Sequence, residues 1–235
     1  MRQCLPSGKI RVFTGQRRPN CNSEHMPAPL PPSVMYLSGK LTLDTQQALL
    51  RDLVQIIEVA PFFSPTMPRT GKPFSVRMTN CGPLGWVSDR GGYRYQPHHP
   101  VTGRPWPAIP SILLDLWHRL SGYPAPPEAC LVNYYDTTAK MGSHQDRDEE
   151  DFEAPVLSVS LGDTAVFHVG GVTRSGPKAR IRLASGDVLL LAGESRLAFH
   201  GIDRILGGSS TLLAPPVFPA GGRLNLTLRR VTKPK

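Results

Sequence analysis

The sequence predicts a mainly β fold with flanking helices. Two amphipathic segments occupy the first half of the chain, and after residue 125 the pattern changes to short runs rich in Val, Leu and Thr. Gly, Pro and Ser separate these runs with no helical periodicity between them, which is typical of a β sandwich or barrel. No internal repeat is visible, so a propeller or a solenoid is not expected.

The composition is that of a globular protein of 235 residues, with 40% hydrophobic and 19% charged residues. This length favours one substantial domain. The 4 cysteines form no CxxC pair and no apolar run is long enough to cross a membrane, so we expect a soluble cytoplasmic protein with reduced thiols. A formal net charge of +9 favours polyanionic partners such as nucleic acid.

The N-terminal part of the chain differs in composition from the rest. Its first 33 residues carry Pro, Gly, Asn and Ser and show no apolar periodicity. We therefore interpret residues 1–33 as a flexible N-terminal extension and residues 34–235 as a single domain. Within that domain, residues 34–125 hold the predicted helices, and residues 126–235 hold the predicted strands of the core.

Two helices are predicted ahead of the strands. Asp44 is the candidate N-cap of the first helix, "TQQALLRDLVQIIEVA", whose apolar side chains recur at helical spacing until Pro61 stops it. The second helix begins at Ser111, continues through "ILLDLWHRLSG", and has Gly122 at its C-terminal end. Both patterns indicate helices that pack one apolar face against the domain.

Seven strands are predicted after the second helix. The runs are "CLVNYY", "VLSVSL", "TAVFHV", "ARIRL", "DVLLLA", "STLLA" and "LNLTLRR". His200 follows "DVLLLA" and immediately precedes Gly201, which indicates a close-packed turn that can direct the imidazole into the mouth of a barrel.

The acidic stretch "SHQDRDEEDFEAP" contains a candidate metal site. Side chains two apart in an extended chain share a face, so His144 and Asp146 can act together while Gln145 points away. With His200 they would form a facial triad of two histidines and one carboxylate, which leaves three positions of an octahedral iron open. The dipeptide His98-His99 is a poorer third ligand because it lies in a predicted loop. The alternative is that the stretch is a solvated acidic loop.

The last predicted strand contains a candidate anion site. In "RLNLTLRR" the leucines share one face, while Arg, Asn, Thr and Arg share the other. Two guanidinium groups can bind carboxylates, so an anionic co-substrate that chelates the metal would use this face, with "LVNYY" adding hydrogen bonds. An ordinary half-buried strand is the alternative. The candidate residues are Asn133, Tyr135, Arg223, Asn225 and Arg229.

These motifs, in this order, resemble the AlkB family of iron(II)- and 2-oxoglutarate-dependent dioxygenases. The resemblance rests on "NYYDTTAKMGSHQDRDEEDFEAPVLSVSLGDTAVFHVGG", "SGDVLLLAGESRLAFHGI" and "RLNLTLRR", and extends upstream through "MTNCGPLGWVSDRGGYRYQP". It implies a double-stranded β-helix (jelly-roll) with an N-terminal nucleotide-recognition lid within residues 34–125. It also implies Fe(II) bound by His144, Asp146 and His200, with 2-oxoglutarate held by the five residues named above and O2 as oxidant.

The resemblance further implies a substrate and the residues that bind it. It implies oxidative demethylation of N1-methyladenine and N3-methylcytosine in single- or double-stranded DNA, with release of formaldehyde, succinate and carbon dioxide, by a monomeric enzyme. RNA is a further expected substrate. The implied substrate residues are Trp86, Tyr93, Tyr95, Asp148 and Arg174.

One position departs from the family pattern. Thr138 stands where relatives usually have Gly in the N-x-Y-x-x-G run, which predicts a differently shaped turn before the metal strand.

Two other functions stay open: the same chemistry on tRNA or on a protein side chain, and a jelly-roll module that binds nucleic acid without catalysis. The aromatic lid residues favour a nucleobase over a protein side chain. The intact arginine face argues against a module with a purely structural metal.

Overall fold

The computed structural model describes residues 28–234, so the predicted extension over residues 1–33 lies almost entirely outside the described residues. The helical elements are α1 (Leu43–Val59), α2 (Ser111–Leu120) and the short 3-10 helix η1 (Gly193–Ser195). The strands are β1 (Val34–Leu37), β2 (Arg77–Cys81), β3 (Gly85–Asp89), β4 (Gly92–Gln96), β5 (Ala129–Tyr135), β6 (Met141–His144), β7 (Val156–Gly162), β8 (Thr164–Gly170), β9 (Lys178–Leu183), β10 (Val188–Leu191), β11 (His200–Leu206) and β12 (Arg223–Arg229).

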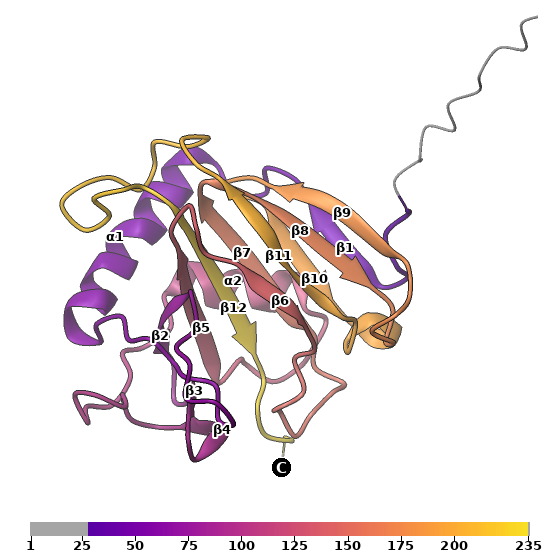
Figure 1. Cartoon of the computed structure of the whole chain (residues 1–235), viewed down its shortest axis with the longest axis horizontal. Coiled ribbons are helices and arrows are strands. Elements are labelled where there is room, and N and C mark those ends of the chain that lie inside the picture. Colours follow the sequence, from indigo (N-terminus) through magenta and orange to yellow (C-terminus); the bar gives the residue numbers. More distant parts are fainter. Residues whose placement is uncertain (1–27, 235) are drawn as a thin grey trace, which may run out of the picture.

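Two antiparallel sheets form the body of the molecule (Figure 1). The larger has six strands in the order β1-β10-β7-β12-β5-β2, and the smaller has four in the order β6-β11-β8-β9. Strands β1 and β2 come before residue 125 in the chain yet join the larger sheet, at its two edges. The sheet therefore draws on both halves of the predicted domain.

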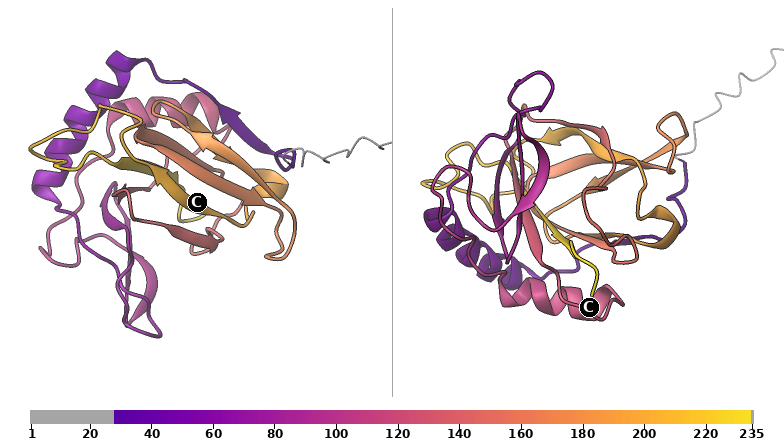
Figure 2. Two further views of the ribbon diagram at one scale, coloured as in Figure 1. Left: turned by 45° about the horizontal axis from the view of Figure 1, so that its top comes forward. Right: turned by 90° about the horizontal axis from the view of Figure 1, so that it is seen from below.

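The core lies in two layers because the larger sheet is covered on both faces. Between the sheets, Leu131 and Leu189 pack with Phe167 and Ile202 of the smaller sheet. On the other face, α1 and α2 pack their apolar side chains against β5, β7 and β12, and Figure 2 shows both helices on that side. No helix within residues 28–234 is long and apolar enough to cross a membrane.

The first helix begins earlier than predicted. Thr42, and not Asp44, is the N-cap, because its side chain accepts a hydrogen bond of 3.3 Å from the backbone N–H of Thr45. Asp44 lies within the first turn, where its carboxylate is placed favourably for the helix dipole. The predicted end of α1 before Pro61 is confirmed, and Gly122 follows α2 in a left-handed conformation with φ of 63°.

Six of the seven predicted runs after residue 125 form strands, and "STLLA" does not. Residues 210–214 lie in a loop, where Leu213 packs into the core without pairing to a neighbouring strand. The prediction of a turn at His200 was also wrong, since His200 is the first residue of β11. Thr138 has no left-handed φ; its backbone N–H and hydroxyl both donate to Asp136, which closes the turn without glycine.

A separate two-stranded sheet, β3 and β4, lies beside the ends of β2 and β5 (Figure 1). It pairs Trp86 with Tyr95 and Ser88 with Tyr93. The sequence indicated only a glycine-rich loop here. The chain reverses over Arg90 and Gly91, and Gly92, which pairs with Asp89 at the start of β4, has a positive φ of 109° that glycine allows.

Candidate metal centre and co-substrate pocket

The three predicted metal ligands meet at one end of the smaller sheet. His144 ends β6, Asp146 follows two residues later, and His200 opens β11 directly opposite His144 in the antiparallel register. One potential ligand atom from each lies within 4.8 Å of the others. His99 lies elsewhere, because its Nε2 contacts the carbonyl of Pro61 at 2.7 Å. The structure thus brings together the triad expected from the sequence.

Hydrogen bonding leaves the two imidazoles ready to bind a cation. The Nδ1 atom of His144 lies 2.9 Å from the carbonyl of Gly142, and that of His200 lies 2.9 Å from the carbonyl of Ala198. A carbonyl oxygen only accepts, so each Nδ1 carries the proton and each Nε2 keeps a free lone pair. These Nε2 atoms lie 3.6 and 3.7 Å from the carboxylate oxygens of Asp146.

The charges around Asp146 also suit a cation. Burial works to raise the pKa of this carboxyl, but Arg229, His200 and His144 outweigh it and hold the pKa well below its usual range. Burial lowers the pKa of His200 to about 4, which keeps this imidazole neutral. The Oδ2 atom of Asp146 is buried and has no hydrogen-bond partner among the described residues. A buried anionic oxygen beside two neutral imidazole nitrogens fits Fe(II).

The triad opens into a cavity of about 560 Å³ between the six-stranded and the four-stranded sheet. Every predicted site residue except Tyr95 lines it. Strand β12 faces β5 in a register that sets Arg223 opposite Tyr135 and Asn225 opposite Asn133. The predicted anion face is therefore on the same wall as the triad, and its strands fix it in place.

Arg223 differs from Arg229, the other arginine of this wall, in having no acidic side chain paired with it among the described residues. It is fully buried, and its guanidinium donates only to the carbonyls of Asp163 and Leu183 and to the hydroxyl of Ser160. No carboxylate forms an ion pair with it within residues 28–234, and its Nε has no partner there. Burial lowers its pKa to about 10, so it remains charged at neutral pH. An unpaired buried cation is costly, and a carboxylate ligand would offset that cost.

Arg229 has a different environment. Its Nη2 lies 2.9 Å from Asp146 and its Nη1 lies 3.1 Å from Glu149. The same Nη1 also donates to the hydroxyl of Tyr95 at 3.1 Å. Burial works to lower the pKa of Arg229, but Asp146, Tyr95 and Glu149 raise it well above its usual range. The two ends of the predicted clamp are thus unequal, because only Arg223 lacks an acidic partner.

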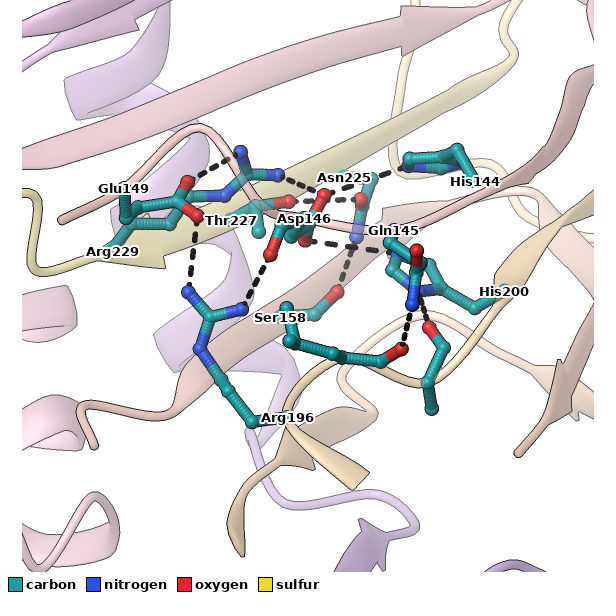
Figure 3. A network of polar contacts seen from close by, with 12 residues as sticks. His144, Gln145, Asp146, Glu149, Ser158, Arg196, His200, Asn225, Thr227 and Arg229 are labelled. Atoms are coloured by element: carbon teal, nitrogen blue, oxygen red, sulfur yellow. Dashed lines mark hydrogen bonds and ion pairs between the residues drawn. The ribbon is translucent and has the colours of Figure 1, made fainter. Parts of the chain in front are cut away.

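The alternative of a solvated acidic loop is wrong for Glu149 and Asp151, which are both buried. Glu149 is 4% exposed and forms ion pairs with Arg196 and Arg229, as Figure 3 shows. Asp151 is also buried and accepts a hydrogen bond from the hydroxyl of Tyr123. Sequence reasoning missed Glu149 and Arg196, because nothing in the local pattern distinguishes them from other charged loop residues.

The two-stranded sheet contributes the mouth of the cavity. The indole Nε1 of Trp86 donates to Asp148 at 2.8 Å, and its ring stacks on Tyr93 with the centroids 5.6 Å apart. Tyr93 is 51% exposed, whereas the Tyr95 hydroxyl points inward to Glu149 and Arg229. The resemblance implied that Tyr95 is a substrate residue, whereas its hydroxyl is engaged here with Glu149 and Arg229. Arg174 also lines the cavity, with its guanidinium over the ring of Phe199.

Comparisons with known proteins agree with this geometry. The model of the 2OG-Fe(II) oxygenase superfamily matches residues 33–229. An alpha-ketoglutarate-dependent dioxygenase AlkB homolog from Caulobacter vibrioides is 57% identical over 82% of this chain and 84% of its own. Alpha-ketoglutarate-dependent dioxygenase AlkB from Escherichia coli is 41% identical over 83% and 88%. The structure of OsALKBH1 superposes with a TM-score of 0.71 at 31% identity, over 87% of this chain and 100% of that one.

Proposed function

The chain belongs to the 2OG-Fe(II) oxygenase superfamily and, within it, to the AlkB dioxygenases, and on this premise we propose that it demethylates cationic N-methylated bases of nucleic acid. It is an oxidative demethylase that uses Fe(II), 2-oxoglutarate and O2. The observation that carries the proposal is the shared cavity. It joins the His-Asp-His triad to the unpaired Arg223, with Trp86 and Asp148 at the mouth.

The residues of the cavity divide into three tasks. His144, Asp146 and His200 would hold Fe(II), which activates O2 for the oxidation of a methyl group when bound. Arg223 would pair with the distal carboxylate of 2-oxoglutarate. Tyr135, Asn133 and Asn225 would hydrogen-bond the same molecule through their O–H and N–H donors, because 2-oxoglutarate offers only acceptors.

The mouth would hold the base outside its stack. Trp86 offers an apolar ring to a flipped base, and Tyr93, which stacks on that ring here, would help to hold it in place. Asp148 would lie beside the base, because its carboxylate is held by the indole of Trp86. A base oxidised at its methyl group carries a hydroxymethyl group on nitrogen, which leaves as formaldehyde. The hydroxyl proton passes to solvent in this step, so the site needs only to hold the base still.

Demethylation can be measured directly. Purified protein with Fe(II), ascorbate, 2-oxoglutarate and O2 should release formaldehyde from oligonucleotides that carry N1-methyladenine or N3-methylcytosine, and should restore the parent base. DNA and RNA strands of one sequence, single and double, rank the nucleic acid classes. Base restoration in none of them would refute the proposal. Activity confined to transfer RNA or to methylated peptides would favour the alternative substrates.

Asp148 is expected to select cationic lesions by its charge. Asn at this position can still accept the hydrogen bond from Trp86, so Asp148→Asn removes the charge and keeps the shape. We expect kcat/KM for N3-methylcytosine, a cation, to fall about tenfold, because an exposed carboxylate gives a screened attraction. Turnover of neutral N3-methylthymine serves as the matched control and should not fall. Equal losses on both bases would contradict the charge mechanism.

The proposal also covers the domain organisation, the oligomeric state, the location and the nucleic acid substrates. Residues 34–235 act as one catalytic domain, which the continuous large sheet supports because it includes β1, β2 and β12. The protein acts as a monomer in the cytoplasm, on DNA and also on RNA. Light scattering of the purified protein tests whether it is a monomer.

A further inference from the structure

Two buried charged residues beside the site have no part in the proposed function. Arg196 and Glu149 are 2% and 4% exposed, and they form an ion pair of 3.1 Å with each other. Arg196 follows η1, and Glu149 lies in the segment between β6 and β7. Neither side chain lines the cavity, so neither contacts the metal, the co-substrate or the base. Their effect on the reaction must pass through their neighbours.

Arg196 holds both ends of the segment that carries Asp146. Its Nη1 donates to the backbone carbonyl of Asp146 at 2.7 Å, and its Nε donates to the carbonyl of Ala154 at 2.7 Å. Its Nη2 donates to Glu149 between those two points, at 3.1 Å. The segment has no strand pairing of its own after His144, so these bonds replace the ladder that would otherwise fix it.

The loop that bears Arg196 also orients the second histidine. Residues 196–199 connect η1 to β11, and the carbonyl of Ala198 in this loop receives the Nδ1–H of His200. Arg196 therefore ties the loop that orients His200 to the main chain of Asp146. A change at Arg196 would move two ligands relative to each other.

Glu149 extends the connection to the co-substrate wall and to the hairpin. Its Oε2 pairs with Arg196, while its Oε1 pairs with Arg229 at 3.1 Å and accepts a hydrogen bond from Tyr95 of β4. Arg229 in turn lies 2.9 Å from Asp146, which closes a ring of two acids and two arginines, visible in Figure 3. Each buried charge in the ring has an opposite neighbour.

We propose that Arg196 and Glu149 are positioning residues, which hold the main chain of Asp146 and the guanidinium of Arg229 where Fe(II) and 2-oxoglutarate are bound. The proposal rests on the proposed function for the roles of Asp146 and Arg229. It predicts that the pair acts on ligand affinity and not only on folding. Partners beyond the ligands orient them, and their loss costs about 10- to 100-fold in metal affinity or activity.

Two single substitutions test the pair. Arg196→Lys keeps the charge but loses the three-way contact, and Glu149→Gln keeps the shape but loses one pairing charge. Fe(II) and 2-oxoglutarate affinities are measured without O2, by calorimetry and by the visible absorption of the iron–2-oxoglutarate complex. All measurements are made well below the unfolding midpoint of each variant. We expect both affinities to fall at least about tenfold.

A control variant is needed to separate a loss of ligand affinity from a loss of stability alone. Glu128→Gln removes one charge from the ion pair of 3.5 Å with Arg230, away from the cavity. This variant should lose stability and keep wild-type affinities. The double variant Arg196→Met/Glu149→Leu removes both charges of the pair and leaves Arg229 paired with Asp146, so it should fold even where the single variants do not. It also removes the donor to the Asp146 carbonyl, so its iron affinity should stay low.

The outcomes separate the possibilities. Wild-type affinities in folded single or double variants would overturn the positioning role and leave the proposed function intact. A wild-type protein that binds neither Fe(II) nor 2-oxoglutarate would overturn both. Weaker binding in the double variant, with restored stability and unchanged binding in Glu128→Gln, would support positioning over a purely structural role.

Discussion

His144→Ala is expected to abolish demethylation, with a loss of at least about 1,000-fold in kcat/KM. The imidazole supplies one of three ligand atoms that lie within 4.8 Å of one another, and no fourth His, Cys, Asp or Glu within residues 28–234 joins this group. The substitution should leave the stability of the fold unchanged, because the side chain is 39% exposed and its removal opens no buried cavity. Formaldehyde release and bound iron, measured by metal analysis, should fall together.

The matched control for this substitution is His118→Ala, which removes an exposed histidine of α2 on the far side of the larger sheet. It should keep full activity and full iron content. His144→Ala with undiminished demethylation would refute the assignment of the triad. Loss of iron without loss of activity would show that another metal site is used.

Arg223→Met is expected to weaken 2-oxoglutarate binding by at least about 100-fold, because a buried guanidinium pairs strongly with a carboxylate. Met keeps an unbranched apolar stem and carries no charge. Without co-substrate, two effects on stability oppose each other: the variant loses donors to two carbonyls and a hydroxyl, and it also loses an unpaired buried charge. We therefore expect its unfolding midpoint to stay within about 5 °C of the wild type.

Thermal unfolding with and without 2-oxoglutarate measures both parts of this prediction. The wild type should be stabilised by about 3 kcal/mol at a co-substrate concentration 100 times Kd, and the variant should show almost no change. Arg180→Met is the control, since this exposed arginine pairs with Asp203 on the outside of the smaller sheet. An Arg223→Met protein with wild-type stabilisation would mean that another residue binds the distal carboxylate.

Much of the fold and site followed from short-range pattern. Apolar residues at helical spacing predicted α1 and α2, and the alternation in "RLNLTLRR" predicted one polar face of β12. The pairing of His144 with Asp146 also followed from the period of two along an extended chain. These features depend on backbone geometry over a few residues, which the sequence states directly.

Other features depended on groups that meet only in the folded chain. The N-cap is Thr42 and not Asp44: both residue types cap helices, and in the folded chain it is the Thr42 side chain that accepts from the N–H of Thr45. Thr138 needed no glycine, since Asp136 accepts its N–H and hydroxyl. The hairpin of β3 and β4 was missed because its glycines indicated a loop, whereas cross-strand pairing makes it a sheet.

The acidic stretch shows the division most clearly. By itself the sequence predicted which acid comes together with His144, because that depends on spacing along the chain. Only the tertiary structure decided that Glu149 is buried, that Tyr95 turns inward to meet it, and that Arg229 is neutralised while Arg223 is not. Burying a charge without an opposite partner costs free energy. The partners of Glu149 are Arg229 of β12 and Arg196 in the loop before β11.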